Sequence, residues 1–433
     1  MATIKTAQMD IKKKFRSAIK RGTGEAYLLM KNNPGVDFSN AIIKAALINL
    51  SYDNQCENSR AEYVYDLMEL SGQKKKIRKA ILNGLMNEKH GNCDLVQLFE
   101  LAVILVKHED QEARKAIYKR FNKKDENAVW AGVNSIIELD GLQGLIRVAD
   151  ARGKMIVKNY EEWDNGFLIK DFQEQNPGIN AWNELIKAGK DNKFIKAYLD
   201  AIRKNKRLNR RRVRPKCSYK TVRDRINKNA IQPLPFYGVK EISSSDIKKN
   251  AADFLKESSP ERLESYLSVF EEVKYPYDYK TILNLAKKRN RKNSRICEFA
   301  STALKYFSGE DIRKFALEKI QTIRIPYGYL DLLVSNYKKE DSKLFTKIIS
   351  RCKDEHEAHT IAQRIINIYE ANKTPECKKP LEDIYNRINC GICRHLIVKI
   401  LIKNKVLSLK IKNEIHYDSY EDTRKLAKSL SSK

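Results

Sequence analysis

Residues 293–317 read NSRICEFASTALKYFSGEDIRKFAL and contain two helical patterns separated by a turn. Apolar and small side chains recur every three or four positions before Ser308 and Gly309, and the same spacing returns after them. Such spacing places these side chains on one side of each helix. Small residues such as Ala300 and Ala303 allow two helices to approach closely. The stretch therefore predicts a pair of short helices packed against each other.

Weaker copies of this unit occur elsewhere in the chain. At residues 109–117 and 420–427, an acidic or polar turn again precedes an arginine in the first turn of a helix. Residues 94–107 carry an apolar surface wide enough to need neighbours on more than one side. Sustained period-2 alternation is almost missing, so the sequence predicts an all-α fold. At intervals of roughly 30 residues, second helices are expected to start near Asn293, Tyr327, Asp354, Gly391 and Ser419.

These residues resemble HEAT repeats, particularly the short bacterial type with an Asp-x-x-Val-Arg-x-x-Ala core. The wider pattern includes RGTGEAYLL at residues 21–29 and CGICR at residues 390–394. It is similar to a bacterial HEAT-repeat (α-solenoid) family over nearly the whole chain. The resemblance implies an α-solenoid of HEAT-like helical hairpins and carries over no catalytic residue.

Burial of apolar surface also favours a solenoid. A lone helical hairpin cannot bury its apolar stripe, so hairpins stack side by side and the core grows in one dimension. The alternative is a compact helical domain, or two such domains, without a true repeat.

The composition restricts the class of protein. The 433 residues include 84 Lys and Arg against 55 Asp and Glu, which gives a formal net charge of +29. A hydrophobic fraction of 42% is enough to bury a substantial core. The chain has neither the roughly 18-residue apolar run of a membrane span nor the apolar core of a signal peptide. Its eight cysteines are too sparse for a disulfide framework, so we expect a soluble, cytoplasmic protein with reduced thiols.

Helical periodicity lapses after Asp200, where cations crowd together and Pro233 and Pro235 follow. Like charges at that density repel, and the prolines cannot continue a helix. We expect residues 203–245 to form a basic connector or insertion, with one short helix at residues 218–229. It would join an N-terminal helical half, residues 1–202, to a C-terminal helical half, residues 246–433.

Three clusters of cations are candidate nucleic-acid or anion-binding residues. Clustered Lys and Arg bind polyphosphate by releasing counterions, and Arg adds forked hydrogen bonds to phosphate oxygens. Tyr219, Phe236 and Tyr237 flank the connector, where exposed rings can stack on unpaired bases. The other interpretation is a solvated linker in a Lys-rich chain. The clusters are Arg203, Lys204, Lys206, Arg207, Arg210, Arg211, Arg212, Arg214 and Lys216; Lys74, Lys75 and Lys76; and Lys287, Lys288, Arg289, Arg291, Lys292 and Arg295.

Cys390 and Cys393 have the spacing of a metal-ligand pair, and His395 and Cys377 lie nearby in sequence. A structural zinc site normally uses four N or S ligands, and only one tight pair is visible here. Small buried thiols packed between helices are the other interpretation. These cysteines are therefore weak metal candidates, and the sequence predicts no cofactor.

His356 and His359 fall on adjacent turns of one predicted helix face. They lack the spacing of a zinc protease, and the sequence shows no third ligand for them. Surface histidines are the favoured interpretation.

Motifs of enzymatic chemistry are missing. There is no P-loop, no Gly-x-Gly-x-x-Gly after a strand and no Gly-x-Ser-x-Gly. Some bacterial HEAT-like proteins are DNA glycosylases, and Asp164 beside Trp163 is the nearest local analogue of their acidic residue and aromatic grip. Packing of tryptophan between helices is the favoured interpretation.

The sequence as a whole predicts a non-enzymatic scaffold that binds nucleic acid or an acidic protein partner through a basic surface. A HEAT-like DNA glycosylase or DNA-repair protein is the alternative from a different class. An adaptor or sensor subunit of a multi-protein bacterial system, such as anti-phage defence, is a third hypothesis that the resemblance permits.

Overall fold

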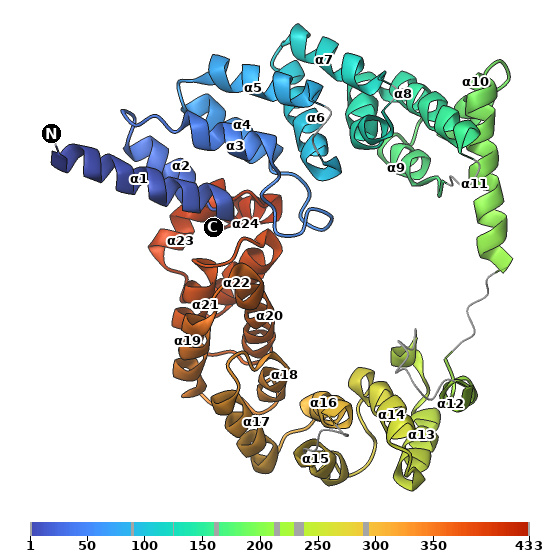
Figure 1. The fold of residues 1–433 in the computed structure, drawn as a ribbon, viewed down its shortest axis with the longest axis vertical. Helices are drawn as coiled ribbons and strands as arrows, with labels where there is room; N and C mark the ends of the chain where they lie inside the picture. The colour runs from blue at the N-terminus through green and yellow to red at the C-terminus, as the bar shows by residue number, and fades with distance from the viewer. Residues whose placement is uncertain are drawn as a thin grey trace. The chain divides into compact units, whose positions relative to one another are not determined.

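The computed structural model describes residues 2–87, 91–123, 125–159, 164–211, 217–228, 238–288 and 294–431. These residues form 24 α-helices and several short 3₁₀-helices, with no strand among them, which confirms the all-α fold (Figure 1). The contacts divide the chain into two compact units. Unit 1 consists of Met1–Val213, Asn389–Ile392 and Leu409–Lys433, and unit 2 of Arg214–Ile388 and Cys393–Ser408.

Unit 1 begins with eleven helices in chain order and is completed by a C-terminal segment. Its elements are α1 (Ala2–Arg21), α2 (Glu25–Asn32), α3 (Ser39–Leu47), α4 (Ala61–Leu70), α5 (Lys74–Met86), α6 (Asn92–Lys107), α7 (Gln111–Phe121), α8 (Glu126–Lys158), α9 (Phe167–Gln175), α10 (Ala181–Ala188), α11 (Lys193–Arg211), α23 (Leu409–Glu414), η6 (Ile415–Tyr417) and α24 (Glu421–Ser431).

Unit 2 is built from shorter helices with 3₁₀ turns between them. Its elements are α12 (Tyr219–Lys228), η1 (Val239–Glu241), α13 (Ser244–Lys256), α14 (Pro260–Glu272), α15 (Lys280–Lys287), α16 (Ser294–Ala303), η3 (Leu304–Tyr306), α17 (Glu310–Thr322), α18 (Tyr327–Leu330), η4 (Asp331–Leu333), α19 (Asp341–Arg351), α20 (Glu355–Ala371), η5 (Pro375–Cys377) and α21 (Lys378–Tyr385), followed by α22 (Gly391–Lys403).

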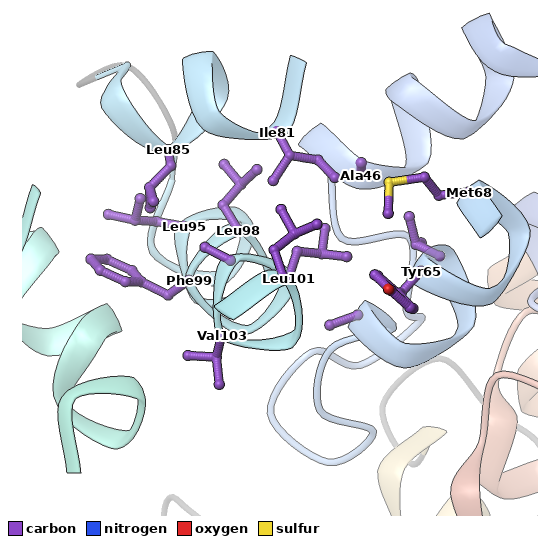
Figure 2. Close-up of a cluster of buried hydrophobic side chains, with 14 of the residues drawn as sticks. Ala46, Tyr65, Met68, Ile81, Leu85, Leu95, Leu98, Phe99, Leu101 and Val103 are labelled. Carbon is purple, nitrogen blue, oxygen red and sulfur yellow. The ribbon is translucent and has the colours of Figure 1, made fainter. Parts of the chain in front are cut away.

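Helix α6 lies at the centre of the larger core of unit 1 (Figure 2). It contacts α3, α4, α5, α7 and α8, as expected of a helix that is apolar on more than one side. Leu95, Leu98, Phe99 and Leu101 are fully buried. Each such side chain contributes about 1.5–3 kcal/mol by leaving water. This core holds α6 and the five helices around it together.

A second, smaller core joins α8 to α9, α10 and α11. Helix α8 bends at Gly141, whose φ of 56° lies in the region that favours glycine. Further along α8, a Cβ at Gly153 would overlap the carbonyl oxygen of Phe194 on α11. The close approach of these two helices therefore depends on glycine, and it sets the position of α11.

The C-terminal segment of unit 1 packs against the first two helices of the chain. The backbone N–H of Ser419 donates to the carbonyl of Gly22 at 2.8 Å. The rings of Tyr27 and Tyr417 stack with their centroids 4.0 Å apart. Unit 1 is therefore made from both ends of the sequence, whereas the sequence pattern places residues 409–433 in a C-terminal half.

In the second half of the sequence the predicted helix starts agree with the structure. Helices α16, α18, α20 and α22 begin at or next to the predicted positions. Ser259 caps α14 by accepting from the N–H of Arg262, and Pro260 occupies the first turn. Asp354 caps α20 in the same way. Local capping chemistry therefore sets where these helices begin.

None of the helices in the described part of the chain is both long and apolar enough to cross a membrane.

Candidate functional site

The exposed side of α11 is a long cationic surface in unit 1. Its inner face buries Ile195, Tyr198, Leu199 and Ile202, which are spaced to lie on one side of a helix. The cations of α11 from Lys193 to Arg207 are all exposed, and all but Lys206, which follows Ile202 by one turn, lie away from the buried side. We call them the basic face of α11, and they are Lys193, Lys196, Arg203, Lys204, Lys206 and Arg207.

Few carboxylates neutralise the basic face of α11. Asp200 lies on the same face and pairs with Arg203 at 3.0 Å. Within the described part of the chain, Lys204, Lys206 and Arg207 form no ion pair. At 1.5 Å per residue, the face runs for about 21 Å along the helix. Apart from Arg203, its cations therefore have no counter-ion among the described residues.

Trp182 of α10 supports this face. Its half-buried ring lies 5.6 Å from the guanidinium carbon of Arg203 and 5.2 Å from Nζ of Lys206. Cation–π attraction holds both side chains over the ring, so part of their conformational entropy is already lost before any ligand binds. Trp182 is thus a half-buried tryptophan whose ring contacts two of the cations of α11.

The structure corrects the predicted lapse of helicity after Asp200, because α11 continues to Arg211. Lys and Arg are good helix formers, and Ile202 still packs on the core. The expected helix at residues 218–229 is confirmed as α12. Arg212, Arg214, Lys216, Phe236 and Tyr237 lie outside the described residues, as do the side chains of Arg210 and Arg211.

The second cluster, Lys74, Lys75 and Lys76, lies in the first turn of α5. Lys74 pairs with Glu69 at 2.7 Å, and Lys76 donates to the hydroxyl of Ser39 at 2.9 Å. These contacts occupy two of the three cations within unit 1. This cluster is therefore a weaker anion site than the basic face of α11.

The third cluster falls in unit 2, around the end of α15 and the start of α16. Lys287 and Lys288 are exposed, and Arg295 lies 3.6 Å from the carboxylate of Glu264. Arg289, Arg291 and Lys292 are outside the described residues.

Asp164 has a structural position in unit 1. It is 5% exposed, and its carboxylate accepts from Arg152 at 2.8 Å and from the N–H of Gly166 at 2.7 Å. The guanidinium carbon of Arg152 lies 3.2 Å from the ring centre of Trp130, which is 43% exposed. Trp163 is outside the described residues. These contacts hold Asp164 in the packing of unit 1.

Unit 2 contains a cleft of about 910 Å³ that no sequence motif indicates. Its charged lining combines three carboxylates with two cations, and Tyr327 adds a half-exposed ring. These residues come from α14, α16, α17, α18, η4 and α20, so no local spacing marks them. The charged side chains are Glu271, Glu298, Asp331, Lys319 and Arg364.

Burial raises the pKa of Glu271 in this cleft from 4.5 to about 7. The folded chain therefore holds a proton that the unfolded chain gives up, and the free energy of unfolding falls as pH rises through this interval. At pH 8 we expect Glu271→Gln to be more stable than the wild type by about 1–2 kcal/mol, a gain that solvent screening of the partly exposed carboxylate keeps small. At pH 4.5 the variant should have little advantage, because Glu271 is then protonated in the wild type. Urea unfolding at both pH values measures the difference.

Glu298→Gln provides the matched control, because Glu298 lines the same cleft but is exposed. Its stability difference from the wild type should be small at both pH values. Equal gains for the two variants at pH 8 would contradict the effect of burial on Glu271.

The described residues thus define an all-helical protein with a cationic surface on α11 in unit 1 and a mixed-charge cleft in unit 2. Comparisons with protein-family models, with curated proteins and with solved structures found no match. The HEAT-repeat resemblance therefore remains a prediction from the sequence.

Proposed function

We propose that the protein is a non-enzymatic α-solenoid scaffold that binds nucleic acid through the basic face of α11. The solenoid is supported by a row of second helices in unit 2, in which α14 contacts α16, α16 contacts α18 and α18 contacts α20. A row of this kind is the expected packing when each helical hairpin contacts only its neighbours.

The cations without protein counter-ions carry the functional proposal. Lys204, Lys206 and Arg207 are exposed in one turn of α11, so their charge is available to an external anion. A nucleic acid supplies phosphates at regular intervals and matches a row of about 21 Å better than a single carboxylate does. The Trp182 ring beside Arg203 and Lys206 adds an aromatic surface of the kind that contacts bases.

The triple variant Lys204→Ala, Lys206→Ala and Arg207→Ala tests the proposal. With labelled single-stranded and duplex oligonucleotides, we expect affinity to fall about 10- to 100-fold near 0.1 M salt. The slope of log affinity against log salt should become shallower by roughly 2–3, because three phosphate contacts are lost. Fluorescence anisotropy over a salt series measures both quantities.

The matched control removes the same charge from unit 2. Lys339, Lys343 and Lys347 are exposed lysines on and just before α19, and replacing all three with Ala should change affinity less than about threefold. Equal losses in the two triple variants would mean that net charge alone drives binding. If polyglutamate binds the wild type and the oligonucleotides do not, the anionic partner is an acidic protein and the nucleic-acid proposal is wrong.

A further inference from the structure

The cleft of unit 2 differs in charge from the chain as a whole. Over the sequence, 84 Lys and Arg outnumber 55 Asp and Glu, whereas the lining of the cleft combines three carboxylates with two cations. Both of these cations already face an acidic side chain. Arg364 lies 3.4 Å from Asp331, and Lys319 lies 3.8 Å from the exposed Glu318. They therefore leave the other two carboxylates of the lining without a counter-ion.

Those two carboxylates belong to helices that contact each other. Glu271 lies in the last turn of α14 and Glu298 in the middle of α16. Within the described part of unit 2, neither of them forms an ion pair. Thr302 is the hydrogen-bonding neighbour of Glu271, and Lys305 attracts it only at longer range than an ion pair. The cleft thus offers two carboxylate acceptors to an external cation.

The other lining residues also favour a positively charged donor. Ser301 is 4% exposed, and its hydroxyl donates to the carbonyl of Cys297 at 2.6 Å. A hydroxyl has one proton, so Ser301 offers only lone pairs to the cleft. Tyr327 is 48% exposed, and the face of an aromatic ring attracts cations. Ile323 and Ile325 add apolar surface that an alkyl stem can contact.

We propose that this cleft binds an organic cation, an alkylammonium or alkylguanidinium group, with Glu271 and Glu298 as its acceptors and Tyr327 against its charged end. An ammonium or guanidinium group has N–H donors and no acceptor, which matches a wall of acceptors. A volume of about 910 Å³ is within the usual range of small-molecule sites. The cleft can therefore hold a free amine or guanidine, or a Lys or Arg side chain of a peptide. This site goes beyond nucleic-acid binding and does not depend on it.

Binding of a cation here should depend on pH through Glu271. Burial raises the pKa of Glu271 to about 7, Glu272 and Glu298 raise it further, and Lys305 opposes them. At pH 6 most chains hold a proton on this carboxylate, and a bound cation must displace it. Affinity should therefore rise about tenfold from pH 6 to pH 8. A guanidinium stays charged at both pH values, so the change reports on the protein.

Calorimetric titration of the full-length chain with butylguanidinium tests the proposal. We expect one saturable site, tighter binding at pH 8, and a heat of binding at pH 6 that varies with the buffer because a proton is released. Butylurea has nearly the same shape without the charge and should not bind measurably. A blocked Gly-Arg-Gly peptide distinguishes the two sources of the cation. Tighter binding of the peptide than of butylguanidinium identifies a basic peptide, and comparable binding identifies a small organic cation.

Three variants assign the effect to the cleft. Glu271→Gln should weaken binding about tenfold at pH 8 and remove the pH dependence. Because this variant is expected to be more stable than the wild type at pH 8, unfolding does not explain the loss. Glu298→Gln should weaken binding at both pH values and keep the pH dependence. Glu272→Gln is the matched control, because Glu272 is the next residue of α14 but is exposed and does not line the cleft, so affinity should change less than about twofold.

Equal binding of butylurea, a wild-type affinity that does not change with pH, or equal losses in Glu271→Gln and Glu272→Gln would each overturn the proposal. The triple variant of α11 separates this site from the proposed function, because it should lose oligonucleotide affinity while its affinity for butylguanidinium stays that of the wild type.

Discussion

Replacing Asp341 with alanine is expected to destabilise unit 2 by about 3–5 kcal/mol. The guanidinium of Arg313 donates to both carboxylate oxygens of Asp341, at 2.7 and 2.8 Å. The two side chains are only 7% and 3% exposed. Removal of the carboxylate leaves the buried guanidinium with the carbonyl of Asn336 and the exposed Glu340 alone, and the N–H of Lys338 also loses its acceptor.

Urea unfolding of the full chain measures this effect, and hydrogen exchange in α17 and α19 localises it to unit 2. Glu340→Ala is the control, because Glu340 is 68% exposed and lies 3.5 Å from the same guanidinium. Its loss should cost less than about 1 kcal/mol, as for other exposed ion pairs. Similar costs for the two variants would mean that burial of the Arg313–Asp341 pair is not what stabilises it.

Ala300→Asp is expected to unfold α16 and its neighbours. Ala300 is fully buried where α16 packs against α14 and α15. A carboxylate there would have no cationic partner and too little space, so we expect a loss of more than about 4 kcal/mol. Circular dichroism and thermal unfolding measure the loss.

Ala371→Asp is the matched substitution at an exposed site, the last residue of α20. It should cost less than about 1 kcal/mol, most of it from an unfavourable charge at the helix C-terminus. A stable, fully helical Ala300→Asp protein would mean that the predicted inner face of α16 is not buried.

Helix positions could be predicted from sequence because their signals are local. Asp110 caps α7 and Ser259 caps α14, each by accepting a backbone N–H within three residues of itself. Such signals need no knowledge of the rest of the fold. The prediction failed after Asp200, where charge density suggested a loop although Lys and Arg favour a helix and Ile202 still reaches the core.

The sites could be predicted only in part, because their residues meet through tertiary packing. The clusters of cations are visible in the sequence, but the contacts of each cation are not. Lys76 of α5 donates to Ser39, whereas Lys206 of α11 lies beside the ring of Trp182. Cys390 and Cys393 are both buried, and the Sγ atom of Cys393 lies 3.4 Å from the Nε2 atom of His359. His359 and Cys393 are 34 positions apart, and no spacing rule connects them. The cleft carboxylates, Glu271 among them, come from several helices and share no motif.

The contact of residues 409–433 with α1 and α2 has a consequence for the order of folding during translation. The Ser419–Gly22 hydrogen bond and the Tyr27–Tyr417 stack can form only after the ribosome has synthesised all of residues 214–388. The first helices must therefore wait with part of their apolar surface uncovered while the intervening unit emerges. Because contacts between distant residues form slowly, completion of unit 1 is expected to be the late step of refolding and the stage most exposed to aggregation or chaperone capture.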